Sequence, residues 1–261
     1  MTKTPLQYSL EILWLWPDIL NLHGDRGNVM ALSRVCEIYG IDANITRVNR
    51  LTDDIDPPAA DLIIMNPGEL ASIFPIVKAL EKSRASLESF VEEKGVLLTI
   101  GTTGAALATK TERADGTTID GLGLLDMICK ERKSIIGDDL IVNAFDKDVY
   151  GIQIQMMDTM LGPDQKPFAE VIYGYGNNGK QTEGAMTDNV IFTNMLGPVL
   201  VKNPWLTLEL IRRALLRKNK NDEKELNDLL KFDPAHFELE LRSAEDIKKF
   251  NTEKEKPAFD R

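Results

Sequence analysis

The segment Val96–Thr111, VLLTIGTTGAALATKT, has the pattern of a reactive turn in an α/β enzyme. An apolar, strand-forming run leads into a tight turn and then into an alanine-rich helix start, which is how such enzymes raise a nucleophile above the sheet. The turn consists of Gly101, Thr102, Thr103 and Gly104, so threonine hydroxyls are its only reactive groups. It lacks the lysine of a P-loop and indicates phosphate binding only weakly, and a plain connection is the alternative.

A second polar turn, NLHGDRGN, follows the first apolar segment of the chain. His23 could lie near the Gly-Thr-Thr-Gly turn, because the carboxyl ends of parallel strands meet at one edge, and there it could activate a threonine. For a histidine in a turn, exposure to solvent is commoner than such a catalytic role, so His23 is also interpreted as a surface residue. Asp25, Arg26 and Asn28 are candidates for ligand or partner contact, or they form only a turn and a helix N-cap.

Other polar residues have simpler interpretations. Asn177 and Asn178 are expected in a tight turn, Glu183 as a surface carboxylate, and His236 as a solvated residue of a charged segment. Cys36 and Cys129 are the only cysteines, and neither belongs to a CxxC motif or a Cys/His cluster. We therefore predict packing roles for both cysteines, no metal site and no cofactor.

The first hundred residues alternate between strand-like and helix-like segments. Apolar, β-rich runs are expected to form strands at 9–16, 43–48, 61–65 and 95–100. A helix should begin near Asn28, and a long helical stretch at 70–95 should break at Pro75. Short glycine-bearing turns between alternating strands and helices predict a three-layer α/β fold, with a mostly parallel sheet covered on both faces.

The pattern changes near Gly121, where strand-like segments follow one another without long helices between them. They lie at 138–145, 150–157, 169–176 and 189–196, and they predict an antiparallel extension of the sheet. An amphipathic helix is expected at 203–218, with a buried stripe of apolar side chains. We predict one domain, 1–218, and a charged C-terminal tail, 219–261, that is loosely ordered or docks on a partner.

Composition limits the classes of partner. The 261 residues carry a formal net charge of −10, which disfavours a general nucleic-acid surface because phosphate binding needs clustered Lys and Arg. No apolar run approaches the roughly 20 residues that span a bilayer, and the start does not have the pattern of a signal peptide. We expect a cytoplasmic protein without nucleic-acid binding or membrane insertion.

Several motifs, in matching order between about Glu11 and Lys218, resemble one family. They are WPDILNLHGDRGNVMALSRVCEIYGI, ADGTTIDGLGLLD, YGYGNN followed by EG, and LGPVLVKNP. The chain resembles the small glutamine-amidotransferase-like subunit of lipid II isoglutaminyl synthase, in the cobyric-acid-synthase-like branch of the class I glutamine amidotransferases. The resemblance implies a flavodoxin-like α/β fold and a subunit that hydrolyses glutamine and passes ammonia to a Mur-ligase-like partner.

The resemblance also shows where this sequence departs from the family. It places Gly101 at the family's nucleophilic cysteine and Leu196 at its catalytic histidine. Pro67 occupies a glycine triplet that supplies oxyanion-hole amides, although proline has no N–H to donate. The segment 151–158, GIQIQMMD, replaces a family segment rich in Asn, His and Gly. We therefore expect no catalytic residue in this chain, and a glycine with positive φ at position 101, where an elbow is strained.

The favoured hypothesis is a degenerate glutaminase-like subunit that binds and supports a Mur-ligase-like synthetase, which uses ATP to amidate the peptidoglycan precursor lipid II. A second hypothesis is a working synthase that takes free ammonia or another nitrogen donor. A third is a small-molecule sensor whose emptied pocket, beside Gly101, Leu196 and Met156, is roomier and more apolar than a glutamine site.

Overall fold

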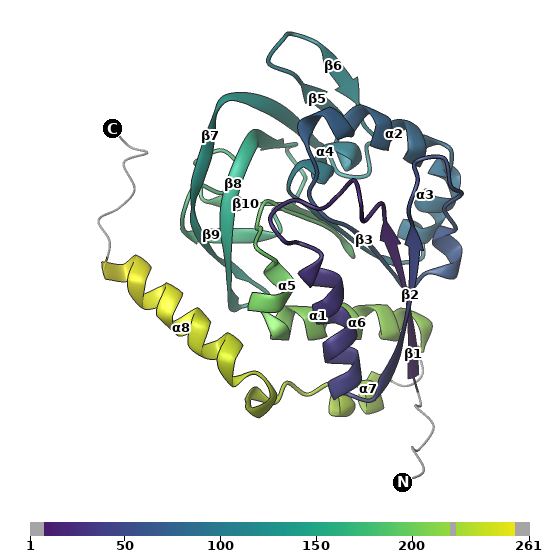
Figure 1. Ribbon diagram of the computed structural model, residues 1–261, viewed down its shortest axis with the longest axis vertical. Helices are drawn as coiled ribbons and strands as arrows, with labels where there is room; N and C mark the ends of the chain where they lie inside the picture. The colour runs from purple at the N-terminus through teal and green to yellow at the C-terminus, as the bar shows by residue number, and fades with distance from the viewer. Residues whose placement is uncertain (1–7, 220–222, 254–261) are drawn as a thin grey trace.

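The computed structural model describes residues 8–219 and 223–253 and contains two β-sheets (Figure 1). The first sheet has six strands in the order β11-β12-β4-β3-β1-β2, and every neighbouring pair is parallel except β11 with β12. Its strands are β1 Tyr8–Leu15, β2 Ile41–Val48, β3 Leu62–Met65, β4 Val96–Ile100, β11 Ala185–Thr187 and β12 Val190–Thr193. The predicted mostly parallel sheet is confirmed.

Helices cover both faces of this sheet. Alternate residues of one strand point to opposite faces, so Leu10 and Ile12 join one hydrophobic core while Leu13 and Leu15 join the other. The first core lies under α1 Gly27–Ile38, α5 Val199–Lys202 and α6 Pro204–Lys218. The second lies under α2 Ile73–Glu81, α3 Arg84–Glu92 and α4 Gly104–Leu107. This is the expected three-layer α/β arrangement.

The long helical stretch breaks at a different place from the one predicted at Pro75. A 3₁₀ turn, η2 Leu70–Ser72, leads into α2, and Pro75 lies in the first turn of that helix. Proline is tolerated there because its position needs no backbone N–H donor. The break lies instead at Lys82 and Ser83, between α2 and α3.

The antiparallel strands are also placed differently from the prediction. Among the described residues, β11 alone extends the first sheet with an antiparallel strand. The strand β12, expected to be antiparallel, pairs with β4 in parallel. The other strands form a second, mixed sheet in the order β10-β9-β7-β5-β6, with β8 paired to β7. They are β5 Lys110–Glu112, β6 Thr118–Asp120, β7 Met127–Ala144, β8 Lys147–Leu161, β9 Ala169–Tyr173 and β10 Thr182–Glu183.

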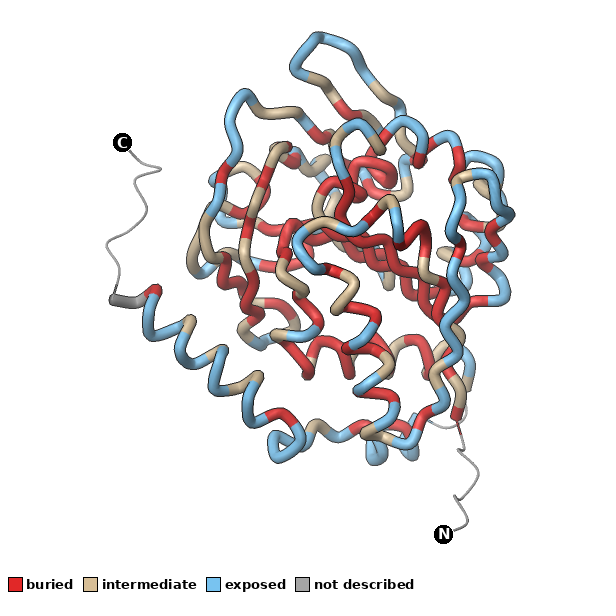
Figure 2. The backbone as a smooth tube through the Cα atoms, in the orientation of Figure 1, coloured by how far each residue is buried: buried red, intermediate tan, exposed pale blue. Residues whose placement is uncertain are grey.

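The C-terminal helix of the predicted domain has the expected buried stripe, with Leu206, Leu210, Ile211 and Leu215 all buried on α6. Beyond it, the described residues form two helices, α7 Glu223–Leu229 and α8 Glu238–Glu253. Most of α8 is exposed at the surface of the molecule (Figure 2).

The described part of the tail packs on the domain. Leu226, Leu230 and Phe237 are buried in the core that contains α1 and α6. Farther along, Lys248 pairs with Asp148 at 2.8 Å. The tail therefore contributes to the core, although a domain boundary at residue 218 stays a prediction. His236 is exposed, as expected.

None of the helices within residues 8–219 and 223–253 is long and apolar enough to cross a membrane.

Candidate functional site

The Gly-Thr-Thr-Gly turn lies at the carboxyl end of β4, where open α/β folds place their active sites. Gly101 follows the strand directly, with φ of +62°, and begins the 3₁₀ turn η3 Gly101–Thr103. The four-residue helix α4 comes next. The positive φ expected at Gly101 is confirmed, and the predicted helix start is a single short turn of helix.

Both threonine hydroxyls of the turn are bonded to backbone groups. Thr102 Oγ1 donates to the carbonyl of Gly68 and accepts from the Gly68 N–H at 3.1 Å. Thr103 Oγ1 accepts from the N–H of Ile100 at 3.2 Å and lies 2.9 Å from its carbonyl oxygen and 3.2 Å from that of Met65. These bonds fasten the turn to the loop after β3, so the hydroxyls serve as structural ties.

Three of the residues that the resemblance singled out, Gly101, Leu196 and Pro67, meet at this turn. A Cβ atom built on Gly101 would lie 3.1 Å from Leu196 Cδ2 and 3.1 Å from Pro67 Cβ. Leu196 is held there by a backbone bridge to Ile152 of β8, in which each N–H donates to the other residue's carbonyl, at 2.8 and 3.2 Å. Residues far apart in sequence therefore fill the space above Gly101 with apolar atoms.

His23 and Arg26 do not join this apolar contact. His23 is exposed, and the threonine hydroxyls bond to backbone groups instead of to its ring. Arg26 forms an ion pair with Asp18 at 2.8 Å and donates to the carbonyl of Pro17 at 3.1 Å. Both partners of Arg26 lie in the same loop, so a structural role is the simpler interpretation of this residue.

Asp25 and Asn28 form a buried cluster with Asn66, which precedes Pro67. Asn28 Nδ2 lies 3.0 Å from Asp25 Oδ1 and 3.3 Å from Asn66 Oδ1, and Asn28 Oδ1 accepts from the N–H of Leu200 at 2.9 Å. The side-chain N-cap proposed from sequence is wrong, because the cap of α1 has no side-chain hydrogen bond. Burial raises the pKa of Asp25 to about 6.

Glu183 is fully buried, so its assignment as a surface carboxylate is wrong. It accepts hydrogen bonds from Thr193 Oγ1 at 3.1 Å and from the Asn194 N–H at 2.6 Å, just past the end of β12. Burial raises its pKa to about 7. Asn177, expected only as a turn residue, is also buried and bonds to both backbone groups of Gly184 at 2.8 Å. The sequence does not predict the burial of either residue, because both lie in polar segments.

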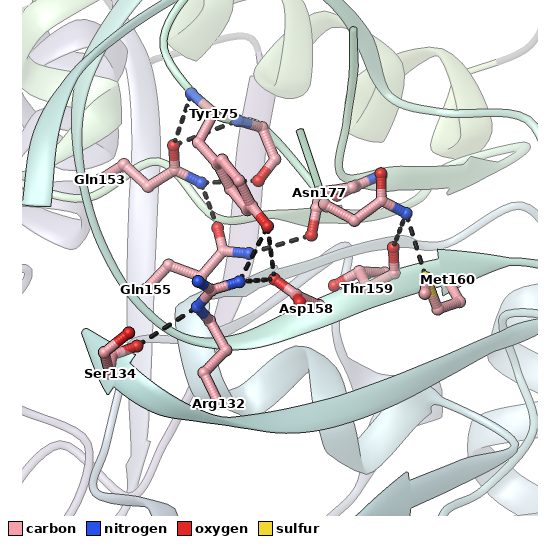
Figure 3. Close-up of polar contacts among 11 residues, drawn as sticks. Arg132, Ser134, Gln153, Gln155, Asp158, Thr159, Met160, Tyr175 and Asn177 are labelled. Carbon is pink, nitrogen blue, oxygen red and sulfur yellow. Dashed lines mark hydrogen bonds and ion pairs between the residues drawn. The ribbon is translucent and has the colours of Figure 1, made fainter. Parts of the chain in front are cut away.

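The segment 151–158 buries two glutamines beneath the loop that contains Asn177 (Figure 3). Gln153 donates to Gln155 and to the Gly176 carbonyl, and it accepts from the N–H groups of Tyr175 and Gly176. Gln155 donates to the Asn177 carbonyl at 3.0 Å. The alternation of apolar and polar residues in GIQIQ predicts a strand. It does not predict that a loop covers the face with the two glutamines.

At the outer end of this network an arginine joins two strands (Figure 3). Arg132 pairs with Asp158 at 2.5 Å and donates to the Tyr175 hydroxyl at 2.8 Å. Asn178 donates to the Thr159 carbonyl at 3.0 Å, which also fixes the loop. The network's bonds hold a loop in place, so we assign it a structural role.

Metal-ligating and thiol groups do not form a further site in the part of the chain that the structure describes. That part contains no cluster of three or more His, Cys, Asp or Glu residues placed to hold a metal ion. Cys36 and Cys129 are buried and unlinked, and burial raises the pKa of both thiols to about 12. Their predicted packing roles agree with this burial.

Sequence comparison finds two relatives along most of the chain. The lipid II isoglutaminyl synthase (glutamine-hydrolyzing) subunit GatD of Streptococcus pneumoniae is 32% identical over 219 residues, covering 82% of this chain and 84% of the relative. The subunit of the same name from Staphylococcus aureus is 28% identical over 214 residues, covering 81% and 86%. No protein-family model matches the chain.

Structural comparison agrees at the level of the fold. A crystal structure of a glutamine amidotransferase superposes with a TM-score of 0.52 at 17% identity, covering 77% of this chain and 98% of the other. The mostly parallel sheet and this similarity establish a class I glutamine amidotransferase-like fold. With the sequence identity to the pneumococcal protein, they show that this chain belongs to the family of the GatD subunit of lipid II isoglutaminyl synthase.

Proposed function

We propose that this chain is a GatD-like subunit that has lost glutamine hydrolysis and supports a Mur-ligase-like synthetase partner acting on lipid II. The relatives are named as glutamine-hydrolysing subunits of a synthase, which implies a second subunit that forms the amide bond. In this complex the chain would stabilise or regulate the synthetase.

The contact of Gly101 with Leu196 and Pro67 carries the proposal. A thiol and an imidazole at the first two positions would be neighbours, because a Cβ on Gly101 would lie 3.1 Å from Leu196 Cδ2. Glutamine hydrolysis by acyl transfer needs a nucleophile, a base and donors for the oxyanion. The residues present supply neither of the first two, and Pro67 has no N–H to donate.

The proposal is tested by isolating the complex from native cells through a tag on this chain. We expect a copurifying protein with a Mur-ligase ATP site. Purified complex would then be assayed for ATP-dependent amidation of lipid II, with glutamine or with ammonium chloride as nitrogen source. If the complex amidates lipid II with ammonium chloride but not with glutamine, glutamine hydrolysis is lost. This result also selects the hypothesis of a working synthase. Amidation driven by glutamine, with no other glutaminase in the preparation, overturns the proposal.

The sensor hypothesis receives no support from four cavities in the described part of the chain. Their linings include neither Gly101 nor Leu196 nor Met156. Leu196 itself is 2% exposed, so the space that the missing catalytic groups would occupy is filled. A metabolite bound to the isolated chain, without any protein partner, would revive this hypothesis.

A further inference from the structure

Three loops from separate strands converge beside Gly101. The loop after β1 contacts the loop after β3, where the Leu22 N–H donates to the Pro67 carbonyl at 3.2 Å. The first turn of α1, which follows this loop, contacts the start of α5 after β12, where the Leu200 N–H donates to Asn28 Oδ1 at 2.9 Å. All three loops lie at the carboxyl edge of the parallel sheet, where ligands bind in this class of fold.

Asn28 links two side chains at this convergence. Its Nδ2 lies 3.0 Å from Asp25 Oδ1 and 3.3 Å from Asn66 Oδ1, and all three residues are 0% exposed. The second polar atom on each neighbour, Asp25 Oδ2 and Asn66 Nδ2, is buried and has no hydrogen-bond partner among residues 8–219 and 223–253. One of these atoms is an acceptor and the other is a donor.

Rearrangement within the cluster does not satisfy both atoms. Exchanging the oxygen and nitrogen of the Asn66 amide would place two N–H donors against each other at Asn28. The Gly197 N–H faces the Asp25 carboxyl as a hydrogen-bond donor, and the Lys202 charge lies nearby. Burial raises the pKa of Asp25 by more than these two groups lower it. Buried polar atoms are paired in almost all native proteins, because an unpaired one loses its hydrogen bonds to water without replacement.

We propose that Asp25 Oδ2 and Asn66 Nδ2 form a binding site for one small neutral molecule with a single heavy atom that both donates and accepts hydrogen bonds. Water and ammonia share this chemistry. Either molecule donates to Asp25 and accepts from Asn66, whereas a metal ion or ammonium would meet the N–H hydrogens of the Asn66 amide. The full burial of both residues leaves the site enclosed.

The site lies directly beside the filled elbow. Asn66 precedes Pro67 and Gly197 follows Leu196, and both Pro67 and Leu196 contact the position of a Cβ on Gly101. Hydrolysis of a glutamine amide releases ammonia, so an ammonia site here would suit a synthase subunit that receives ammonia from elsewhere. Only this ammonia alternative rests on the function proposed above. The site itself does not depend on it.

A high-resolution crystal structure of the full chain, grown at about pH 8 in potassium salts, tests the site. We expect an electron-density peak about 3 Å from both Asp25 Oδ2 and Asn66 Nδ2. A direct bond between these two atoms, with no peak, would overturn the proposal. Neither result depends on a partner or on catalysis, so failure of the site is distinct from failure of the proposed function.

Two further measurements distinguish the ligands. Thermal unfolding is compared in ammonium chloride and in potassium chloride of equal concentration, for the native chain and for Asp25→Asn. In this variant both side chains at the site are amide N–H donors. Water has two lone pairs and can accept from both donors, whereas ammonia has one lone pair and can accept from only one. Bound ammonia predicts an ammonium-specific rise in unfolding temperature that Asp25→Asn removes and the exposed control Asp18→Asn keeps. Bound water predicts no ammonium-specific rise and a peak that persists in Asp25→Asn.

Discussion

At Gly101 the backbone and the neighbouring side chains impose separate constraints on the residue. The φ of +62° disfavours any residue with a Cβ, and the contacts with Leu196 and Pro67 leave little room for one. Glycine has no Cβ, so it adopts this turn without strain. The turn is predictable from sequence because it lies between a buried strand and a helix start, a pattern that is local. The role of position 101 within the turn comes instead from the family resemblance.

We expect Gly101→Ala to lower the free energy of unfolding by about 1 to 3 kcal/mol. Gly123→Ala is the matched control, because Gly123 has a similar φ of +69° and a Cβ there would meet nothing within 4 Å. Backbone strain alone should cost about 1 kcal/mol in the control. Chemical denaturation of both variants gives the comparison, and an equal or smaller loss at Gly101 would mean that Leu196 and Pro67 leave room for a side chain.

Glu183 should make stability depend on pH. Its pKa is about 7 in the folded protein against an ordinary 4.5, so the carboxyl favours folding fully only below pH 4.5. That contribution is lost as pH rises from 4.5 through 7. We expect Glu183→Gln to gain on the order of 1 to 3 kcal/mol relative to the native chain between about pH 5 and pH 8. Unfolding measured at both values, with exposed Glu92→Gln as control, checks this, and equal pH dependence of native and variant chains would contradict it.

Among the elements, the loop after β3 and the turn after β4 act as one unit because Thr102 joins them. Sequence patterns located both elements correctly, since their strands are short, apolar and bounded by Gly and Pro. They did not reveal that the Thr102 hydroxyl would bond to Gly68, 34 residues away. The same limit applies to GIQIQ, whose period of two predicts a strand but cannot tell which face another loop covers.

Thr102→Ala should therefore loosen the loop after β3. The Gly68 N–H loses its acceptor, which lies at 3.1 Å, and the unfolding free energy should fall by about 1 to 2 kcal/mol. Thr102→Ser keeps the hydroxyl and is the control. Hydrogen exchange at the Gly68 amide is the local measurement, and it should accelerate in the alanine variant alone. Unchanged exchange in Thr102→Ala would show that the tie does not hold the loop.

At the scale of the whole molecule, the sequence does not predict which strands pair or where the tail packs, because both depend on contacts between residues far apart in the chain. The strand-like segments after residue 121 were recognised, but their sheet depends on pairing partners that local periodicity does not specify. The charge of the tail likewise predicts loose order or docking on a partner, but it does not predict that three of its apolar side chains lie in the core shared by α1 and α6.

A chain ending at Lys218 should still fold, because both sheets and their covering helices precede that residue. It should unfold at a lower temperature than the full chain, since Leu226, Leu230 and Phe237 leave the core, each worth about 1.5 to 3 kcal/mol at most. Calorimetry of the two chains, with Phe237→Ala in the full chain, measures the loss. Equal unfolding temperatures would mean that the docked tail contributes nothing, and failure to fold would make it integral to the domain.

We propose that this chain does not hydrolyse glutamine, because Gly101 and Leu196 stand where the family resemblance places the catalytic cysteine and histidine. Ammonia release from glutamine by the purified full chain, with and without its copurified partner, tests this most directly. We expect no release above the buffer rate, and none from the double variant Gly101→Cys, Leu196→His, because Pro67 still provides no oxyanion donor. Turnover by the native chain that disappears in Thr102→Ala or Thr103→Ala would contradict the account and identify a threonine as the nucleophile.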